Sequence, residues 1–330
     1  MPGVENIYMR WGKAEAHANL GLVKYWGKDD EELILPSSPS ISLTIDALTT
    51  DTEVYLDDSN ERRIIINDRT IDSPRIDEYC RFLMDELKLS ETGYRLISKT
   101  SFPTETGLSS SSAGYAALAG AFVSTAEKRL TSSELSRLAR RGSGSACRSI
   151  TGGFNIWKCG NDKTSFAEHI DSNLDKSIRV LIIVLSPNKK DTPSREGMRI
   201  ARTSPLYHSF IAQCQRDAAE MRSAIEKEDL RRVGEIAEQN ALAMNRVNAT
   251  ATPKLSYTDR RTDAVYALTS SLRRIYNVCC YCSNDAGCNP FVICDQSSLK
   301  LLEEKVGALF PDAQLIEAAS GPGLEVYHGR

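Results

Sequence analysis

Stretches with the two-residue periodicity of a β-strand alternate with stretches of helical periodicity, and this alternation restricts the fold more than any other feature. Residues 41–45 and 52–56 alternate apolar and polar side chains, as half-buried strands do. Residues 109–128 are rich in alanine and lack proline, which predicts a helix that follows a loop of glycine and serine. The alternation therefore predicts an α/β or α+β fold.

The same patterns continue into the second half of the chain. Residues 179–185 (RVLIIVL) form an apolar run typical of a buried strand, and residues 291–294 predict another. Apolar side chains recur at helical spacing over residues 207–225 and 299–309. Strands and helices are thus expected in both halves.

The length of the chain favours two lobes. A chain of 330 residues exceeds what a single hydrophobic core usually holds. Pro187 ends the apolar strand, and a loop follows it. We therefore expect an N-terminal lobe of residues 1–187 and a C-terminal lobe of residues 188–330.

The charge balance excludes some classes of partner. A net charge of -3 argues against broad electrostatic binding to nucleic acid or to an anionic membrane. A phosphorylated ligand would need a local basic pocket instead. No stretch approaches the roughly 20 apolar residues that span a bilayer, and residues 1–12 lack the apolar segment of a signal peptide. We expect a cytoplasmic protein.

Five of the nine cysteines lie between Cys279 and Cys294. An odd number in a long chain without a secretion signal does not suggest a disulfide framework. The five do not form two Cys-x-x-Cys pairs, and no histidine lies nearby, so a zinc site is not expected. We interpret most of them as small buried side chains on a strand.

A first cluster of polar residues, ANLGLVKYWGK, occupies residues 18–28. Lys24 and Lys28 lie four residues apart, beside Tyr25 and Trp26. An ammonium group is a point charge suited to a phosphate or to a developing oxyanion. Solvated lysines at the end of an amphipathic strand are an equally good interpretation of this segment alone.

A second cluster, PTETGLSSSSAG, precedes the alanine-rich helix. Gly107 permits unusual backbone angles, and the N–H groups at a helix start bind anions. The loop differs from a Walker loop because no GKS or GKT follows. A serine-capped helix start explains one serine but not four. We therefore predict phosphate binding by the four consecutive serines, Ser109, Ser110, Ser111 and Ser112.

A third cluster, RRGSGSACRSITGGFNIW, occupies residues 140–157 and begins at the end of the short helix that we expect to stop at Gly142. It brings Ser143, Ser145 and Arg148 together between glycines. A guanidinium can hold a carboxylate or phosphate through two parallel hydrogen bonds. A helix end followed by a turn would explain only the glycines, so we favour a binding role.

A fourth cluster, SNDAGCN, follows the cysteine-rich strand and contains Asp285. An aspartate in a tight turn more often caps the turn than performs chemistry. Taken alone, this segment is interpreted as structural.

Read together, the four clusters resemble the GHMP kinase superfamily, and most closely the diphosphomevalonate decarboxylase family. The segments specific to that branch are KYWGK at 24–28, GSGSACRS at 142–149 and SREGM at 194–198. The resemblance implies a two-lobed α+β fold, with an N-terminal lobe like domain 2 of ribosomal protein S5 and a ferredoxin-like C-terminal lobe. It also implies a homodimer.

The activity that the resemblance implies is a carbon–carbon lyase reaction. With ATP and Mg²⁺, such an enzyme phosphorylates the 3-hydroxyl of mevalonate 5-diphosphate, and the 3-phosphate then leaves together with carbon dioxide to give isopentenyl diphosphate. The departing tertiary phosphate provides the sink for the electrons of the breaking C–C bond. Cations and N–H donors around that phosphate would lower the barrier.

The resemblance also assigns roles to residues. Asp285 matches the catalytic aspartate beside the 3-hydroxyl, Lys24 the lysine near the same oxygen, and Arg148 the arginine that holds the substrate carboxylate. Along the phosphorylated arm of the substrate it places Tyr25, Lys28, Ser143, Ser145, Ser194 and Arg195. In the nucleotide loop it places Gly107, Ser109, Ser110, Ser111 and Ser112, with the Ser111 hydroxyl toward magnesium.

Departures from the family pattern leave alternatives open. Residues 38–40 read Ser-Pro-Ser where the family usually has Asn-Ser-Ser, and Cys288 follows the DAG turn where proline is usual. The substrate could therefore be mevalonate 5-phosphate, or a 3,5-bisphosphate that needs no ATP. A small-molecule kinase is less favoured because of the decarboxylase-type segments GSGSACRS and KYWGK. A non-catalytic binder of isoprenoid phosphates is less favoured because Lys24, Arg148 and Asp285 are all present.

Overall fold

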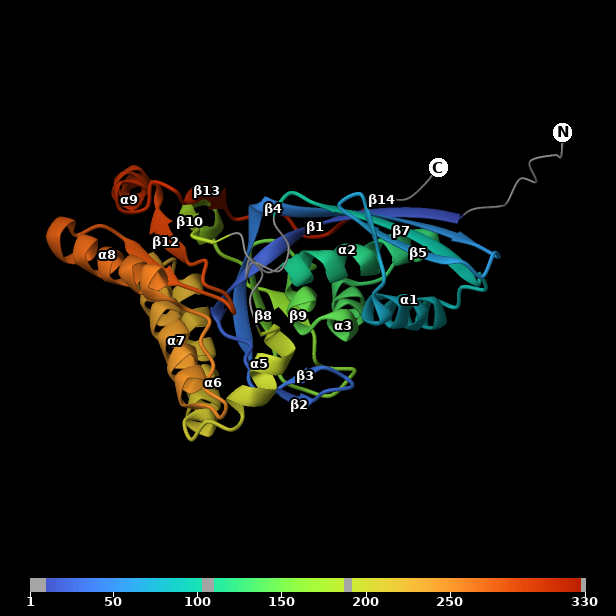
Figure 1. Ribbon diagram of the computed structural model, residues 1–330, viewed down its shortest axis with the longest axis horizontal. Helices are drawn as coiled ribbons and strands as arrows, with labels where there is room; N and C mark the ends of the chain where they lie inside the picture. The colour runs from blue at the N-terminus through green and yellow to red at the C-terminus, as the bar shows by residue number, and fades with distance from the viewer. Residues whose placement is uncertain (1–9, 103–109, 187–191, 328–330) are drawn as a thin grey trace.

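The computed structural model describes residues 10–102, 110–186 and 192–327, which form two halves side by side (Figure 1). Within the described residues the larger sheet has eight strands. In spatial order these are β14 (Glu325–Tyr327), β1 (Arg10–Val23), β4 (Ser40–Asp57), β7 (Gly93–Thr100), β5 (Arg62–Ile66) and β6 (Arg69–Ile71), with β8 (Phe154–Trp157) and β9 (Ala167–His169) continuing from the first part of β4.

Three helices cover one face of this sheet (Figure 1). They are α1 (Pro74–Leu87), α2 (Ser110–Thr125) and α3 (Ser132–Gly142). The alanines of α2 let it lie directly against β1 and β4, and almost all of its side chains are buried. A capping box of Thr131 and Glu134 fixes the start of α3.

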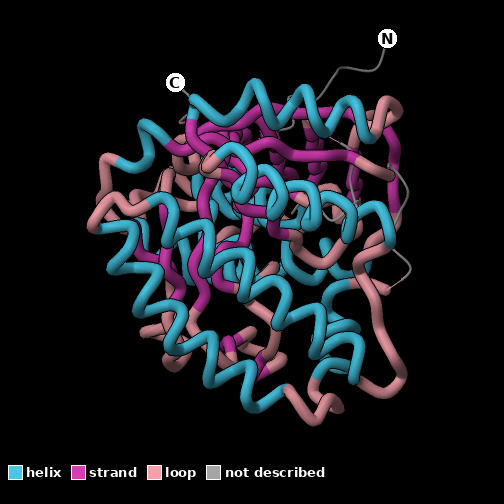
Figure 2. Tube along the Cα trace, turned by 90° about the vertical axis from the view of Figure 1, so that its left-hand side faces the viewer, coloured by secondary structure: helices cyan, strands magenta, loops and turns pink. Residues whose placement is uncertain are grey.

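A second, antiparallel sheet forms the other half. Its strands, in spatial order, are β11 (Cys280–Ser283), β12 (Phe291–Asp295), β10 (Ile178–Val184) and β13 (Gln314–Ala319). The helices of this half are α5 (Ser194–Ala201), α6 (Tyr207–Glu226), α7 (Leu230–Thr250), α8 (Arg260–Tyr276) and α9 (Gln296–Leu309), several of which lie in front of the strands in Figure 2. The short helix α4 (Leu174–Ser177) precedes β10.

The two faces of β10 contribute to different cores. Val180 and Ile182 belong to the large core that also includes α6 and α7, whereas Leu181 and Ile183 pack in a smaller core with α8 and α9. This alternation is the two-residue period of a strand buried on both faces. It explains why residues 179–185 read as an uninterrupted apolar run.

The chain crosses between the halves twice. β10 pairs with β12 and β13, so the change of sheet comes before residue 178, earlier in the chain than the predicted lobe boundary near residue 187. Residues 320–327 then return to the first half, where Gly321 N donates to Thr44 O and β14 pairs with β1. The division into residues 1–187 and 188–330 stays a prediction.

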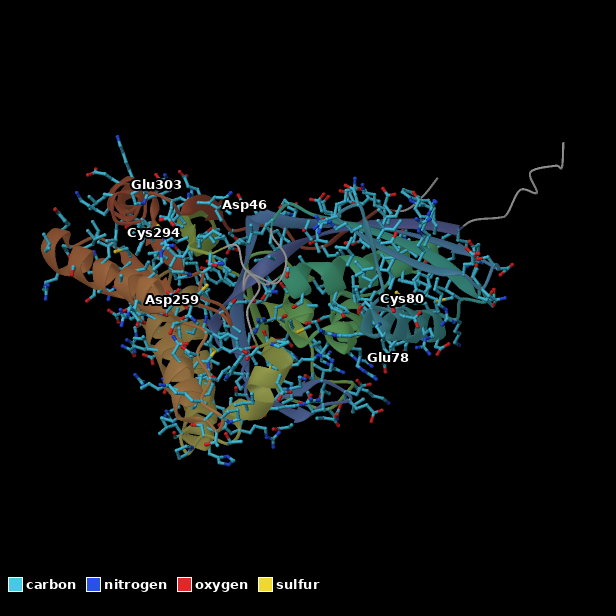
Figure 3. The ribbon with its side chains drawn as sticks, in the orientation of Figure 1. Asp46, Glu78, Cys80, Asp259, Cys294 and Glu303 are labelled. Atoms are coloured by element: carbon cyan, nitrogen blue, oxygen red, sulfur yellow. The ribbon has the colours of Figure 1, made fainter. Side chains whose placement is uncertain are left out.

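All nine cysteines are free thiols. Cys80 on α1 and Cys294 on β12 lie in opposite halves of the molecule (Figure 3). Cys280 and Cys294 are buried neighbours across β11 and β12, consistent with the interpretation as small side chains on strands. The described residues contain no group of three His, Cys, Asp or Glu side chains placed to hold a metal ion. Nor does any helix among them have the length and apolar character to cross a membrane.

Candidate active site

A cavity of about 280 Å³ lies where the two halves meet. Segments from both halves line it, including the end of β1, the start of α2, the η1 helix (Gly144–Ser149), the start of α5 and the turn after β11. The predicted residues that line it are Lys24, Tyr25, Lys28, Ser110, Ser111, Ser143, Ser145, Arg148, Ser194, Arg195 and Asp285. Five segments that are distant in sequence thus surround one space.

Lys24 and Asp285 form an ion pair inside this cavity. Lys24 Nζ lies 2.9 Å from Asp285 Oδ1, and it also donates to Gly21 O at 2.5 Å and to Ser283 Oγ at 3.0 Å. These three acceptors match the three protons of an ammonium group. Burial lowers the pKa of Lys24, while the charge of Asp285 raises it and that of Arg148 lowers it.

The backbone around Lys24 explains how this pair forms. A Cβ atom on Gly21 would lie 2.9 Å from Asp285 Oδ1, so a glycine is needed for the carboxylate to reach β1. Gly21 N donates to Asp285 Oδ2 at 3.3 Å. On the other side, Lys24 N donates to Asn240 Oδ1 on α7 at 2.9 Å. The second half therefore fixes both the main chain and the side chain of Lys24.

Arg148 lies in η1 and is anchored by neutral groups. Its Nε donates to Asn19 Oδ1 at 3.2 Å, and its Nη1 donates to Ser40 Oγ at 2.6 Å. The side chain is almost fully buried, which lowers its pKa, and no ion pair joins it to a carboxylate of the described residues. A buried guanidinium of this kind is suited to an incoming carboxylate.

Tyr25 and Lys28 lie at the end of the cavity near α5. Tyr25 Oη is buried without a hydrogen-bond partner among the described residues, and burial raises the pKa of this phenol. Buried polar atoms in folded proteins usually have a partner, so this hydroxyl indicates a place for a ligand. Lys28 is also buried and forms an ion pair with Glu31.

The start of α5 brings Ser194 and Arg195 to the same end. Arg195 Nη2 donates to Gly142 O at 3.2 Å, which ties α5 to the end of α3. Gly197 lets α5 pack closely against Tyr257, because a Cβ atom there would lie 2.1 Å from Tyr257 Oη. Ser143, which follows Gly142 directly, lines the cavity together with Ser145.

The described part of the serine cluster begins at Ser110. Ser110 and Ser111 begin α2 and line the cavity, whereas Ser112 is fully buried and accepts a hydrogen bond from Asn19 N at 3.4 Å. Ser112 thus contacts β1 and is not among the described residues that line the cavity. Gly107 and Ser109 lie outside the described residues.

A second cavity of about 210 Å³ adjoins the first at Ser110 and Ser111. Its lining is mainly apolar and comes from α1, α2, β4, β5 and β7. It includes Ile66, Ile76, Leu96, Tyr115 and Leu118. The two serines thus stand between a basic cavity and an apolar one.

Sequence reasoning missed several residues of the site. Arg75 on α1 lines the cavity and donates to Gly142 O at 2.9 Å. Its sequence context, a Ser-Pro helix start, contains no sign of this role. Asn19, which anchors Arg148, lies within the first cluster. A polar amide between apolar strand residues is the sequence feature that could have indicated its role.

Comparisons with known proteins support the arrangement. Residues 16–167 match the profile of the diphosphomevalonate decarboxylase-like N-terminal domain, and residues 180–324 match that of the mevalonate 5-diphosphate decarboxylase C-terminal domain. The chain is 33% identical to diphosphomevalonate decarboxylase of Candida albicans, over 86% of this chain and 84% of that protein. The chain belongs to the diphosphomevalonate decarboxylase family.

Other members of the decarboxylase family extend the comparison. A solved complex named MDDEF with MVAPP, AMPPCP and magnesium has a TM-score of 0.92 and 37% identity, covering 97% of this chain and all (100%) of that one. The Enterococcus faecalis mevalonate diphosphate decarboxylase has a TM-score of 0.90 and 36% identity, with the same coverage. These likenesses confirm the two-lobed α+β fold of GHMP kinases. Phosphomevalonate decarboxylase of Haloferax volcanii is 31% identical over 89% of this chain and 91% of that protein.

Proposed function

We propose that this protein catalyses the ATP-dependent decarboxylation of mevalonate 5-diphosphate to isopentenyl diphosphate. The observation that carries the proposal is the convergence of Lys24, Arg148 and Asp285 on one cavity between the halves. Membership of the decarboxylase family fixes the reaction class as that of a carboxy-lyase. The residue roles below are part of the proposal.

Asp285 is placed to accept the proton of the 3-hydroxyl. Its Oδ1 contacts Lys24, whose ammonium group offsets the negative charge that develops on the oxygen. As the 3-phosphate leaves, Asp285 faces the carbon that gains positive character. One carboxylate thus serves both stages: it first accepts the hydroxyl proton, and once it has passed that proton on to the transferred phosphate or to solvent it is charged again and acts as a counter-charge.

Arg148 holds the carboxylate of the substrate in an orientation that favours its loss. Asn19 and Ser40 fix the guanidinium before the substrate arrives, so little side-chain entropy is lost on binding. Tyr25, Lys28, Ser143, Ser145, Ser194 and Arg195 bind the phosphorylated arm. This division puts the reacting carbon near Asp285 and the diphosphate near α5.

The two adjoining cavities fit a nucleotide. The apolar cavity suits a purine base, and Ser110 and Ser111 at the start of α2 suit the phosphates, because the N–H groups of a helix start attract anions. ATP supplies the phosphoryl group, and Mg²⁺ neutralises the charge on it. With few carboxylates in the cavity, Mg²⁺ would be held by the phosphates and the Ser111 hydroxyl.

Mevalonate 5-phosphate is a second candidate substrate, and the similarity to the Haloferax volcanii enzyme favours it. The proposal also includes a cytoplasmic location and a homodimer, as the family resemblance implies. Light scattering on the eluting chromatographic peak tests the dimer.

A substrate panel tests the proposed function. The purified protein is incubated with mevalonate 5-diphosphate, 5-phosphate or 3,5-bisphosphate, each with and without Mg-ATP, and released carbon dioxide is measured. We expect release from the 5-diphosphate only with Mg-ATP. Faster release from the 5-phosphate would move the assignment to the second candidate, and release from the bisphosphate alone would overturn ATP dependence. ADP formation without carbon dioxide would indicate a kinase.

A further inference from the structure

Lys28 and Glu31 form a close ion pair at the end of the cavity where we place the phosphorylated arm. Lys28 Nζ lies 2.6 Å from Glu31 Oε2, within the hairpin of β2 (Lys28–Asp30) and β3 (Leu35–Pro36). The Lys28 side chain is 2% exposed and lines the cavity, whereas the Glu31 side chain is 43% exposed. The ammonium group therefore belongs to the cavity wall, and the carboxylate reaches water.

Glu31 is surrounded by more cations than the one it pairs with. Arg195 lines the same cavity, and Arg199 Nε lies 3.9 Å from Glu31 Oε1. Burial lowers the pKa of Lys28, Glu31 raises it, and the positive charges of Arg195 and Arg199 lower it. Glu31 is thus the carboxylate that balances a buried ammonium group within a cluster of cations.

The hairpin that carries the pair is held by other contacts. Arg202 Nη1 donates to Lys28 O at 2.7 Å, and Arg140 Nε donates to Leu33 O at 3.1 Å. These bonds fix the main chain on both sides of Glu31. The Glu31 carboxylate is therefore not required to hold the hairpin in place, and its contact with Lys28 can break without moving the backbone.

We propose that Glu31 is an exchangeable counter-ion of Lys28 and a specificity-determining residue of the site. This inference rests on the proposed function, because it takes the phosphorylated arm to lie beside Lys28. A phosphoryl group that enters the cavity competes with Glu31 for the ammonium group. The released carboxylate loses little, since water solvates an exposed charge.

The negative charge of Glu31 also acts on the choice between ligands. Its repulsion grows with the charge of the ligand, so it opposes a diphosphate more than a monophosphate. Glu31 therefore reduces the difference in affinity by which the site prefers a diphosphate ligand over a monophosphate ligand. A residue that served only to orient Lys28 would have the opposite effect, because its loss would weaken every phosphorylated ligand.

Calorimetry on matched variants distinguishes a Glu31 that repels charged ligands from a Glu31 that only orients Lys28. We compare Glu31→Gln with Glu32→Gln, a neighbouring exposed glutamate of the same hairpin turn. A Glu31→Ala variant covers the case in which the glutamine amide itself bonds to Lys28. The ligands are mevalonate 5-diphosphate and mevalonate 5-phosphate, titrated without nucleotide, so that the readout does not depend on turnover.

We expect Glu31→Gln and Glu31→Ala to bind the 5-diphosphate about three- to ten-fold more tightly than the wild type, the effect of one exposed charge near the ligand. The gain for the 5-phosphate should be smaller, and Glu32→Gln should change neither by more than about two-fold. Weaker or unchanged binding in both Glu31 variants would overturn this inference but would leave the proposed function standing. Failure of the wild type to bind either ligand would overturn the proposed function and this inference with it.

Discussion

Lys24 Nζ lies 2.9 Å from Asp285 Oδ1, although 261 positions separate the two residues in the sequence. Lys24 follows the first strand of one sheet, and Asp285 follows an edge strand of the other. Neither half of the chain holds the pair by itself. The reaction centre therefore depends on how the two halves pack, as well as on the loops that supply its side chains.

Replacing Asp285 with asparagine tests its role as a base. Asparagine keeps the size of the side chain but has neither the charge nor the capacity to accept the hydroxyl proton. We expect turnover to fall by a factor of about 10² to 10⁴, with much smaller change in substrate affinity. Carbon dioxide release measures turnover, and the melting temperature serves as the folding control. Near-normal turnover would rule out the proposed role.

The pH dependence of turnover tests Lys24. Burial lowers its pKa, and an ammonium group is charged only below its pKa. If turnover needs the charged ammonium group, it is therefore at its maximum at lower pH. It then declines as the pH rises through the pKa of Lys24, which lies below the usual lysine range. Arginine stays protonated, so the residual activity of Lys24→Arg should lack this decline. The same alkaline decline in both proteins would assign it to another group.

Lysine in place of Arg148 tests the grip on the substrate carboxylate. Lysine keeps the positive charge but cannot make two parallel hydrogen bonds to a carboxylate. We expect the dissociation constant of mevalonate 5-diphosphate to rise about 10- to 100-fold, equivalent to about 1.4 to 2.7 kcal/mol. Ser40→Ala removes one anchor of the guanidinium and should have a smaller effect. Unchanged affinity in Arg148→Lys would show that the carboxylate binds elsewhere.

Gly197 tests the seating of α5. A Cβ atom there would lie 2.1 Å from Tyr257 Oη, so Gly197→Ala should displace the helix that carries Ser194 and Arg195. We expect a loss of about 1 to 3 kcal/mol in the free energy of unfolding and a weaker affinity for the substrate. Tyr257→Phe removes the clashing oxygen, so the double variant should recover part of both losses. No recovery would place the cost of the alanine elsewhere.

Gly307 in α9 is a control for Gly197, because it is a helical glycine in an open position. A Cβ atom at this site of α9 meets no other atom within 4 Å. Alanine costs less backbone entropy in a helix, so Gly307→Ala should raise the free energy of unfolding by about 0.5 to 1 kcal/mol. Chemical denaturation measures the gain, and turnover should stay unchanged. A loss of stability would indicate a contact of α9 that the structure does not contain.

Much of the secondary structure follows from local pattern. The apolar run of β10 and the helical spacing of α6 and α9 are confirmed by the structure. Residues 41–45 and 52–56, which read as separate segments, instead belong to the single strand β4. The break in alternation at Asp46 and Ala47 is an exposed part of this strand, and local sequence cannot distinguish it from a turn.

The site was predictable where small polar residues gather in loops without a structural need for them. The serines and lysines around the cavity stand out for that reason. Arg75 and Glu31 do not, since one reads as part of a helix start and the other as a surface charge. Their importance arises from packing between distant segments, which carries no local signal. Ser112 stands in a serine run that suggested phosphate binding, and its hydroxyl also contacts the backbone of β1, which the run itself does not indicate.

The return of residues 325–327 to β1 affects any attempt to divide the protein. A fragment that ends before β10 would leave β1 without its partner strand at residues 13–15, and such an exposed edge recruits strands from other molecules. The complementary fragment would carry β14 with no strand to join. Each piece would therefore tend to aggregate when produced alone, and co-expression of both would be needed to recover a soluble assembly.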